Sequence, residues 1–208
     1  MQENKEKMWS VPFVLLLLAN TLNTMSGHLV NPIFAEYQLS RWVDFVYTGV
    51  ISSILSWVSM CCTPFWGSKC DESDLKKLAI FAYGGIAVST FMYSLADSMI
   101  TIIIVRALHG IFFGLSTTLS VTFAVKYVPK SRLAEGVGYI GMGSLVGNLI
   151  GPQIGSTISD LYGVNNLIYV CFALGVICIA FTMLVPYKFE KVVKIKKKNS
   201  SVIIMKKN

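Results

Sequence analysis

Six apolar stretches, each long enough to cross a bilayer, limit the fold of this chain more than any other feature of its sequence. A transmembrane helix needs about 20 mainly apolar residues, and such stretches occupy about residues 9–31, 43–66, 76–96, 98–125, 134–158 and 164–186. Only 14% of the 208 residues are charged, against about 25% in a typical soluble domain. The sequence therefore predicts an all-α membrane protein, with a six-helix transmembrane domain over residues 1–187 and a basic cytoplasmic tail over residues 188–208.

The basic residues gather in alternate connections. Of the 18 lysines and arginines, 16 lie before the first stretch, between the second and third, between the fourth and fifth, or in the tail. Cytoplasmic segments of membrane proteins carry such an excess of positive charge. We therefore expect a multi-pass protein of the cell (plasma) membrane with both termini cytoplasmic. Topology and attraction to anionic lipid explain the net charge of +7, so the lipid bilayer is the expected partner and nucleic acid is not.

Glycines recur at every fourth position of the fifth stretch. Gly143, Gly147, Gly151 and Gly155 share one helix face because residues four apart lie nearly above one another, and Pro152 lies among them. In water each glycine would weaken a helix by about 1 kcal/mol, whereas in a bilayer small residues let two helix backbones approach closely. Proline removes a backbone donor and favours a bend. The pattern predicts a tightly packed, bent membrane helix.

The segment GNLIGPQIGS (147–156) resembles a motif in the fifth helix of proton-coupled exporters of the major facilitator superfamily, G-x-x-x-G-P-x-x-G-G. Ser156 replaces the last glycine with another small residue. In the fourth stretch, Arg106 and Gly110 fit the superfamily pattern R-x-x-Q-G-x-G, and His109 takes the glutamine position. The alternative for the glycines is generic small-residue packing in an unrelated membrane protein.

Polar residues within the apolar stretches are candidates for a proton or substrate pathway. Arg106 lies about 12 Å from the outer end of its stretch at 1.5 Å per residue, and charge at such depth points to function. The resemblance implies a role in proton coupling or substrate engagement; the alternative is an arginine held by carbonyls or by asparagines of the first stretch. The other candidates are His109 and the residues of the polar second half of the first stretch, namely Asn20, Asn23, Thr24 and His28. That half, which we expect to end at Pro32, either faces a wet cavity or joins helices by hydrogen bonds.

The connection between the second and third stretches resembles the superfamily motif G-x-x-x-D-R/K-x-G-R-R/K. The matching residues, which the resemblance assigns to a gating loop, are Gly67, Asp71, Lys76 and Lys77. In the family this carboxylate typically pairs with basic groups and helix ends and holds the cytoplasmic side shut. Glu72 and Asp74 depart from the pattern, since a base and a glycine are expected there, and ordinary solvated loop charge is the alternative.

The resemblance covers nearly the whole chain and implies half of the superfamily fold, built from two inverted three-helix repeats. Alternating access requires two such halves, so we expect either a truncated transporter or a chain that pairs with a second half, including another copy of itself. The implied function is secondary transport, most plausibly export of a small molecule or drug driven by the proton gradient. An importer, or a non-transporting bundle or inactive relic, is the alternative. The sequence shows no nucleophile–base pair, metal cluster or phosphate-binding loop, so we expect no enzyme activity, cofactor or metal.

Overall fold

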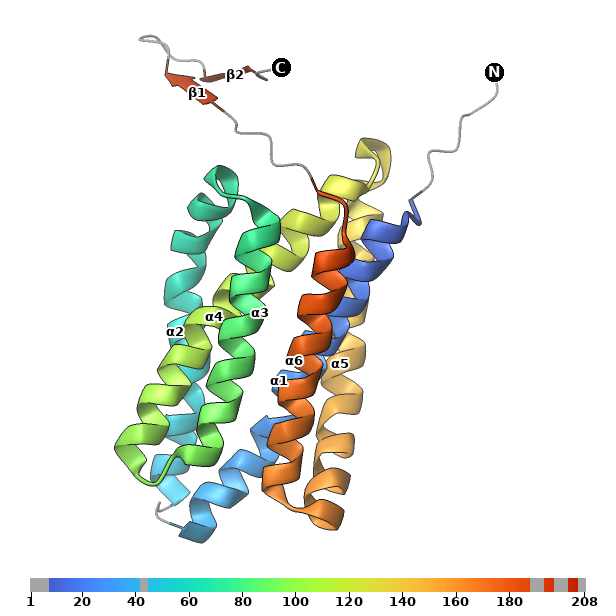
Figure 1. Ribbon diagram of the computed structural model, residues 1–208. Coiled ribbons are helices and arrows are strands. Elements are labelled where there is room, and N and C mark those ends of the chain that lie inside the picture. The colour runs from blue at the N-terminus through green and yellow to red at the C-terminus, as the bar shows by residue number, and fades with distance from the viewer. Residues whose placement is uncertain (1–7, 42–44, 188–192, 197–201, 206–208) are drawn as a thin grey trace.

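The computed structural model describes residues 8–41, 45–187, 193–196 and 202–205. This part of the chain forms six long helices (Figure 1): α1 (Val11–Arg41), α2 (Phe45–Glu72), α3 (Leu75–Met92), α4 (Met99–Ala124), α5 (Leu133–Tyr162) and α6 (Val164–Leu184). Short 3-10 turns, η1 (Tyr93–Leu95), η2 (Val125–Tyr127) and η3 (Lys130–Arg132), follow α3 and α4. The helices alternate in direction, so α1 begins and α6 ends at the same end of the bundle, the upper end in Figure 1. We call it the terminus end and the opposite one the far end.

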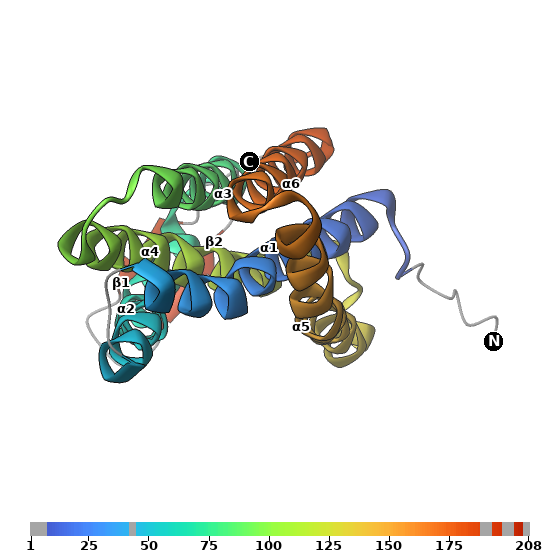
Figure 2. The same cartoon turned by 90° about the horizontal axis from the view of Figure 1, so that it is seen from below.

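The helices pack as two related groups of three. Figure 2 shows α1 and α4 in the middle of the bundle, with α3 and α6 side by side along one face. α1 packs on α5 and α6, α4 packs on α2 and α3, and α3 packs on α6. Replacing α1, α2 and α3 by α4, α5 and α6 turns each of these contacts into another one of the set. The predicted all-α fold of two inverted three-helix repeats is therefore confirmed.

Glycines let two of these helix pairs approach to backbone contact. A Cβ atom on Gly147 of α5 would lie 2.8 Å from the backbone nitrogen of Met25 in α1, too close for any side chain. Its neighbours in the glycine series, Gly143, Gly151 and Gly155, meet α1 equally closely. A second seam of the same kind joins α4 to α2, where a Cβ on Gly110 would lie 2.7 Å from the carbonyl oxygen of Leu55. The close packing predicted from the glycine spacing is confirmed, and α5 continues as one helix through Pro152.

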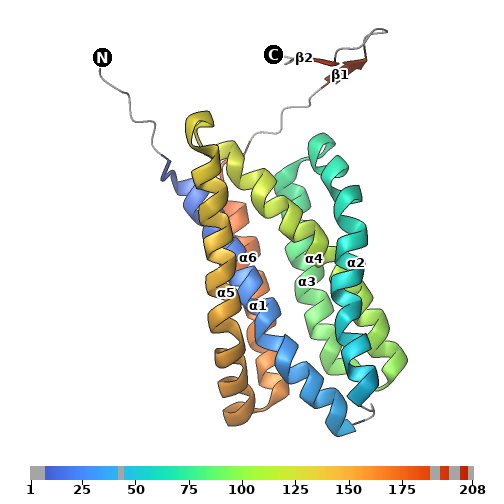
Figure 3. The ribbon, with the colours of Figure 1, turned by 180° about the vertical axis from the view of Figure 1, so that it is seen from behind.

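Five segments of the described helices are long and apolar enough to cross a membrane, at residues 11–31, 47–72, 75–95, 99–127 and 164–184. The predicted span at 134–158 is not among them. Its helix, α5, is as long as its neighbours and runs beside α1 (Figure 3), but its glycines, Asn148 and Gln153 lower its mean hydropathy. The residues that allow close packing are thus the ones that weaken its apolar character.

Three predicted boundaries are wrong. The first helix does not end at Pro32 but continues to Arg41, and the second continues through Pro64 to Glu72. A proline removes only one hydrogen bond from a long membrane helix, which tolerates it. The tail, expected to be mobile and solvated, contains an antiparallel pair of strands, β1 (Val193–Lys196) and β2 (Val202–Met205). Both strands are rich in β-branched residues, which favour extended structure; the other tail residues lie outside the described part.

Candidate functional site

A layer of polar residues crosses the interior of the bundle between two apolar clusters. The cluster at the terminus end includes Phe13, Leu75, Leu119 and Val185, and the cluster at the far end includes Leu29, Ile51, Ile102 and Leu167. The buried polar residues between them, contributed by α1, α3 and α4, are Asn20, Asn23, Ser26, Ser89, Thr90, Arg106 and His109. Because buried polar groups need partners, the contacts of this layer decide what it can do.

Arg106 is the largest fully buried side chain in the described part, with 2% of its surface exposed. It lies two turns into α4, about 10 Å from the start of that helix at 1.5 Å per residue. Its Nη1 donates a hydrogen bond of 3.0 Å to Oδ1 of Asn31 in α1. Its Cζ lies 5.5 Å from the ring centroid of Tyr93, within the range of a cation–π interaction. The expected alternative partner, an asparagine of the first helix, is therefore present.

His109 lies one turn further along α4 and is 5% exposed. Its Nδ1 is 3.2 Å from the Tyr93 hydroxyl, and its ring meets that of Phe113 edge to face, with centroids 6.4 Å apart. Nε2 is buried and has no hydrogen-bond partner among the described residues. Arg106 and His109, predicted together from the sequence, thus share Tyr93 as a neighbour.

The polar residues of α1 do not form one site, because they divide between two neighbouring helices. Asn20 donates hydrogen bonds to α5, at the Ile140 carbonyl (3.1 Å) and Ser144 Oγ (3.0 Å). Asn23 instead donates to Oγ of Ser116 in α4 (3.2 Å). These bonds join helices, which was one of the two roles expected for this face.

Thr24 and His28 belong to the side of α1 that faces the glycine series. A Cβ on Gly147 would lie 3.2 Å from Cβ of Thr24, and one on Gly151 would lie 2.9 Å from Cβ of His28. Thr24 also donates to the carbonyl of Asn20 in its own helix (2.9 Å). Both residues therefore contribute to the seam between α1 and α5, whereas Arg106 and His109 lie on α4.

The predicted gating loop is helical. Gly67 and Asp71 lie on the last turns of α2, and α3 begins at Leu75. Asp74, which departs from the superfamily motif, caps α3: its carboxylate accepts hydrogen bonds from the backbone nitrogens of Lys76 (3.0 Å) and Lys77 (3.2 Å). An aspartate at this position satisfies donors that glycine could not, which explains the departure.

Lys76 joins α3 to the end of α6. Its Nζ donates to the carbonyl oxygens of Met183 (2.7 Å) and Val185 (2.8 Å). The last carbonyls of a helix lack partners within it and carry partial negative charge, so a lysine there is favourable. Lys77 is exposed. Of the two lysines predicted from the motif, the structure shows a helix-capping contact for Lys76.

The chain leaving α6 is also fastened to η2, at the terminus end. The Tyr127 hydroxyl donates to the Pro186 carbonyl (2.8 Å). The ring of Tyr187 packs edge to face on Phe123, with centroids 5.1 Å apart, and lies 5.5 Å from Nζ of Lys126. We call residues Val185–Tyr187 the exit segment; its contacts tie α6 of the second repeat to α3 of the first and to the end of α4.

Tyr93 and Asn31 are the residues of the Arg106 surroundings that the site prediction omitted. Asn31 belonged to the predicted polar half of the first stretch, so helical spacing could have included it. Tyr93 gave no such signal, because it stands in an apolar segment 16 residues before His109. The contact depends on how α4 crosses the end of α3, which no spacing rule describes.

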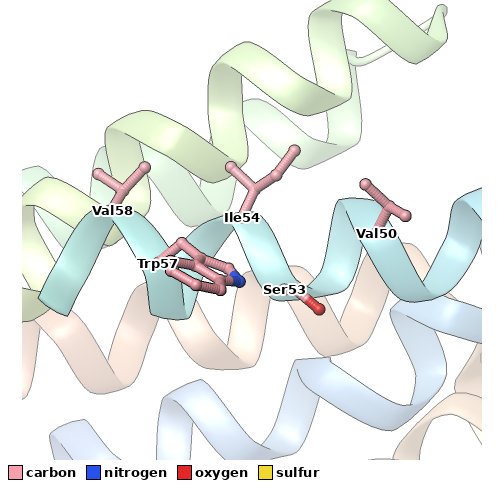
Figure 4. Close-up of a pocket in the computed structure, with 5 residues that line it drawn as sticks. All are labelled: Val50, Ser53, Ile54, Trp57 and Val58. Atoms are coloured by element: carbon pink, nitrogen blue, oxygen red, sulfur yellow. The ribbon is translucent and has the colours of Figure 1, made fainter. Parts of the chain in front are cut away.

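A shallow pocket of about 350 Å³ lies on α2, lined by Val50, Ser53, Ile54, Trp57 and Val58 (Figure 4). Val50, Ile54 and Val58 project from the same side of the helix in this view, with Trp57 and Ser53 beside them. All five residues belong to α2, and Trp57 is 65% exposed. The pocket is therefore an outward-facing hollow, separate from the buried polar layer.

The fold and the buried layer define an all-α, multi-pass membrane protein built from inverted three-helix repeats. The family description "Major Facilitator Superfamily" matches residues 16–206, and the chain belongs to this family of membrane transporters.

Curated relatives cover only part of their own length. The multidrug resistance protein MdtG of Proteus mirabilis is 30% identical over 66% of this chain and 34% of that protein. An uncharacterized MFS-type transporter of Methanocaldococcus jannaschii is 28% identical over 86% of this chain and 42% of its own. The MdtG protein of Escherichia coli O1:K1 is 25% identical over 72% of this chain and 36% of that protein. The chain thus matches well under half the length of each of these relatives.

Proposed function

We propose that this chain is one six-helix half of a secondary transporter that exports small molecules, drugs among them, at the expense of the proton gradient. Two relatives carry the name multidrug resistance protein, which supports a drug-like substrate. The glycine-rich α5 resembles the fifth helix of the superfamily's exporters and supports export over import.

The observation that carries this proposal is the buried guanidinium of Arg106 between α1, α4 and the end of α3. Placing a charge within a membrane domain is costly, and such residues generally serve ion or substrate pathways. Superfamily transporters bind substrate near the middle of the membrane between two halves. A polar layer that holds Arg106 and His109 in the interior is consistent with one wall of such a pathway.

The second half is either the remainder of a longer polypeptide or a separate chain. Exposed apolar side chains on α2 and α5 are available to meet it or to face lipid, and the largest are Trp57, Phe65, Met142, Leu145 and Leu149. The intact mass of the native polypeptide distinguishes the two forms. A mass near the 23.0 kDa of this chain requires a separate partner, and a mass about twice as large places both halves in one protein.

The transport proposal is tested in an efflux-deficient bacterium that produces the native polypeptide. We expect cells to accumulate less ethidium and chloramphenicol, one cationic and one neutral compound, than cells without the protein. In inverted vesicles, adding either compound should release protons, detected by acridine orange. Arg106→Ala should abolish both effects while the amount of membrane-inserted protein is unchanged.

Arg132→Ala is the matched control, because Arg132 is at the surface and its guanidinium pairs with the carboxylate of Glu135 on the next turn (2.6 Å). It should leave export intact. Export without proton release would refute the coupling ion, uptake instead of export would favour an importer, and no transport of any compound would favour a non-transporting bundle.

A further inference from the structure

One aromatic residue contacts both of the candidate residues on α4. Tyr93 opens the 3-10 turn η1 after α3 and is 2% exposed. Its hydroxyl lies 3.2 Å from Nδ1 of His109, and its ring centroid lies 5.5 Å from Cζ of Arg106. Arg106 and His109 are three residues apart and so neighbour each other on the helix surface. Tyr93 therefore reaches two adjacent polar side chains from another helix.

The two contacts use different parts of the tyrosine. A buried hydroxyl needs a hydrogen-bond partner, which Nδ1 of His109 supplies. The face of an aromatic ring attracts a cation, and the attraction is strongest where water is excluded. Removing the hydroxyl alone should disturb His109, whereas removing the ring should also disturb Arg106. The two effects can be separated by substitution.

The contact with His109 also settles which ring nitrogen is committed. A histidine side chain offers two nitrogens; Nδ1 faces the Tyr93 hydroxyl, and Nε2 is buried with no hydrogen-bond partner in the described part of the chain. The Tyr93 hydroxyl can donate to Nδ1 or accept from it, so the ring stays anchored in either tautomer. Nε2 is then the atom left to bond a molecule that enters the layer.

We propose that Tyr93 is the positioning residue of the transport site: its ring holds the Arg106 guanidinium in place, and its hydroxyl fixes the His109 ring so that Nε2 serves bound substrate or water. Tyr93 belongs to the first three-helix repeat, and Arg106 and His109 belong to the second. The site is therefore assembled across the two repeats. This inference rests on the proposed transport function.

The test compares Tyr93→Phe, which keeps the ring, with Tyr93→Leu, which removes it. For ethidium export per folded molecule, Tyr93→Phe should raise KM about threefold to tenfold, as expected for one lost hydrogen bond, and leave the maximal rate nearly unchanged. Tyr93→Leu should in addition lower the maximal rate about 30-fold, as expected for a lost cation–π contact in a dry site. The aromatic variant thus preserves the rate that the aliphatic one loses.

Tyr83→Phe is the control for deleting a buried tyrosine hydroxyl from α3. Tyr83 is 3% exposed and belongs to the apolar cluster at the terminus end. A residue that only stabilises the fold would reduce the amount of folded protein without changing KM or the rate per molecule. If both Tyr93 variants behave like Tyr83→Phe in export, the inference is overturned.

A second measurement does not require transport. Melting temperatures of the purified protein are compared for Tyr93→Phe, His109→Leu and the double variant. The inference expects the double variant to melt close to the less stable single variant, because both substitutions remove the same contact; additive effects would overturn it. If the unsubstituted protein exports nothing while the melting effects are non-additive, the contact stands but the proposed function fails, and a transport role for Tyr93 fails with it.

Discussion

At the scale of single residues, the interior of the bundle distinguishes polar groups that join helices from those that surround Arg106. Asn20 and Asn23 each connect α1 to a different helix through their side-chain amides. Asn31, only two turns further along, accepts from the guanidinium instead. One polar face of α1 therefore serves packing over its first part and the candidate site over its second.

Replacing Asn20 by leucine should destabilise the protein and leave the site intact. The substitution removes two hydrogen bonds between α1 and α5, and an interhelical bond in a membrane protein contributes about 0.6 kcal/mol. We expect the free energy of unfolding in detergent to fall by about 1 kcal/mol, with ethidium export per folded molecule unchanged. Thr63→Ala is the control, since the exposed Thr63 hydroxyl bonds only within α2. A loss of export in Asn20→Leu would place this residue in the pathway after all.

At the scale of helices, the bundle is assembled through glycine seams. The four glycines of α5 meet α1, and Gly110 and Gly114 of α4 meet α2. In both seams a helix of one repeat lies against a helix of the other. Because the backbone itself occupies the space of a side chain, these seams set the distance between the repeats.

Gly155→Ala should separate α5 from α1, because the new methyl group would overlap the backbone of Leu29. Overpacking of this kind costs about 1–3 kcal/mol, so we expect a clear fall in melting temperature. Gly141 is the matched control on the same helix, since a Cβ there meets nothing within 4 Å. Gly141→Ala should melt no lower than the unsubstituted protein; equal losses in both variants would show that the seam does not require glycine.

Lys76 and Lys77 form a second matched pair, at the start of α3. Only for Lys76 does the described structure show hydrogen bonds to the last carbonyls of α6. Charge at a helix C-terminus contributes about 0.3–1 kcal/mol, so Lys76→Met should lower the free energy of unfolding by about that amount. Lys77→Met should change it little. The comparison is made by thermal unfolding in the same detergent.

At the scale of the whole molecule, the sequence predicts what depends on periodicity and composition. The six helices, the glycine seam and the pairing of Arg106 with a first-helix asparagine follow from residue spacing. What could not be predicted depends on where helices cross: the contacts of Tyr93, the division of the α1 polar face, and the lysine cap between α3 and α6. The helix ends at Arg41 and Glu72 were missed because proline was taken as a stop.

The distribution of charge over the whole molecule predicts its orientation. Among the described residues, Lys69, Lys77, Lys126 and Lys130 are exposed near the terminus end, and this end should face the cytoplasm. In a variant whose five cysteines are replaced by serine, Asp97→Cys at the far end should react with a membrane-impermeant maleimide in intact cells. Ser131→Cys at the terminus end should react only after the cells are opened. The reverse pattern would refute the orientation.

The exit segment has a consequence for assembly. Lys76, Tyr127 and Phe123 hold residues 185–187 against the bundle, so the chain that follows starts from a fixed point beside α3 and α4. A tether with a fixed origin confines what it carries to a smaller volume and raises its effective concentration at the surfaces within reach. Whatever continues from Tyr187 is thereby delivered to one region of the terminus end, and loosening the exit segment would dilute it over a wider one.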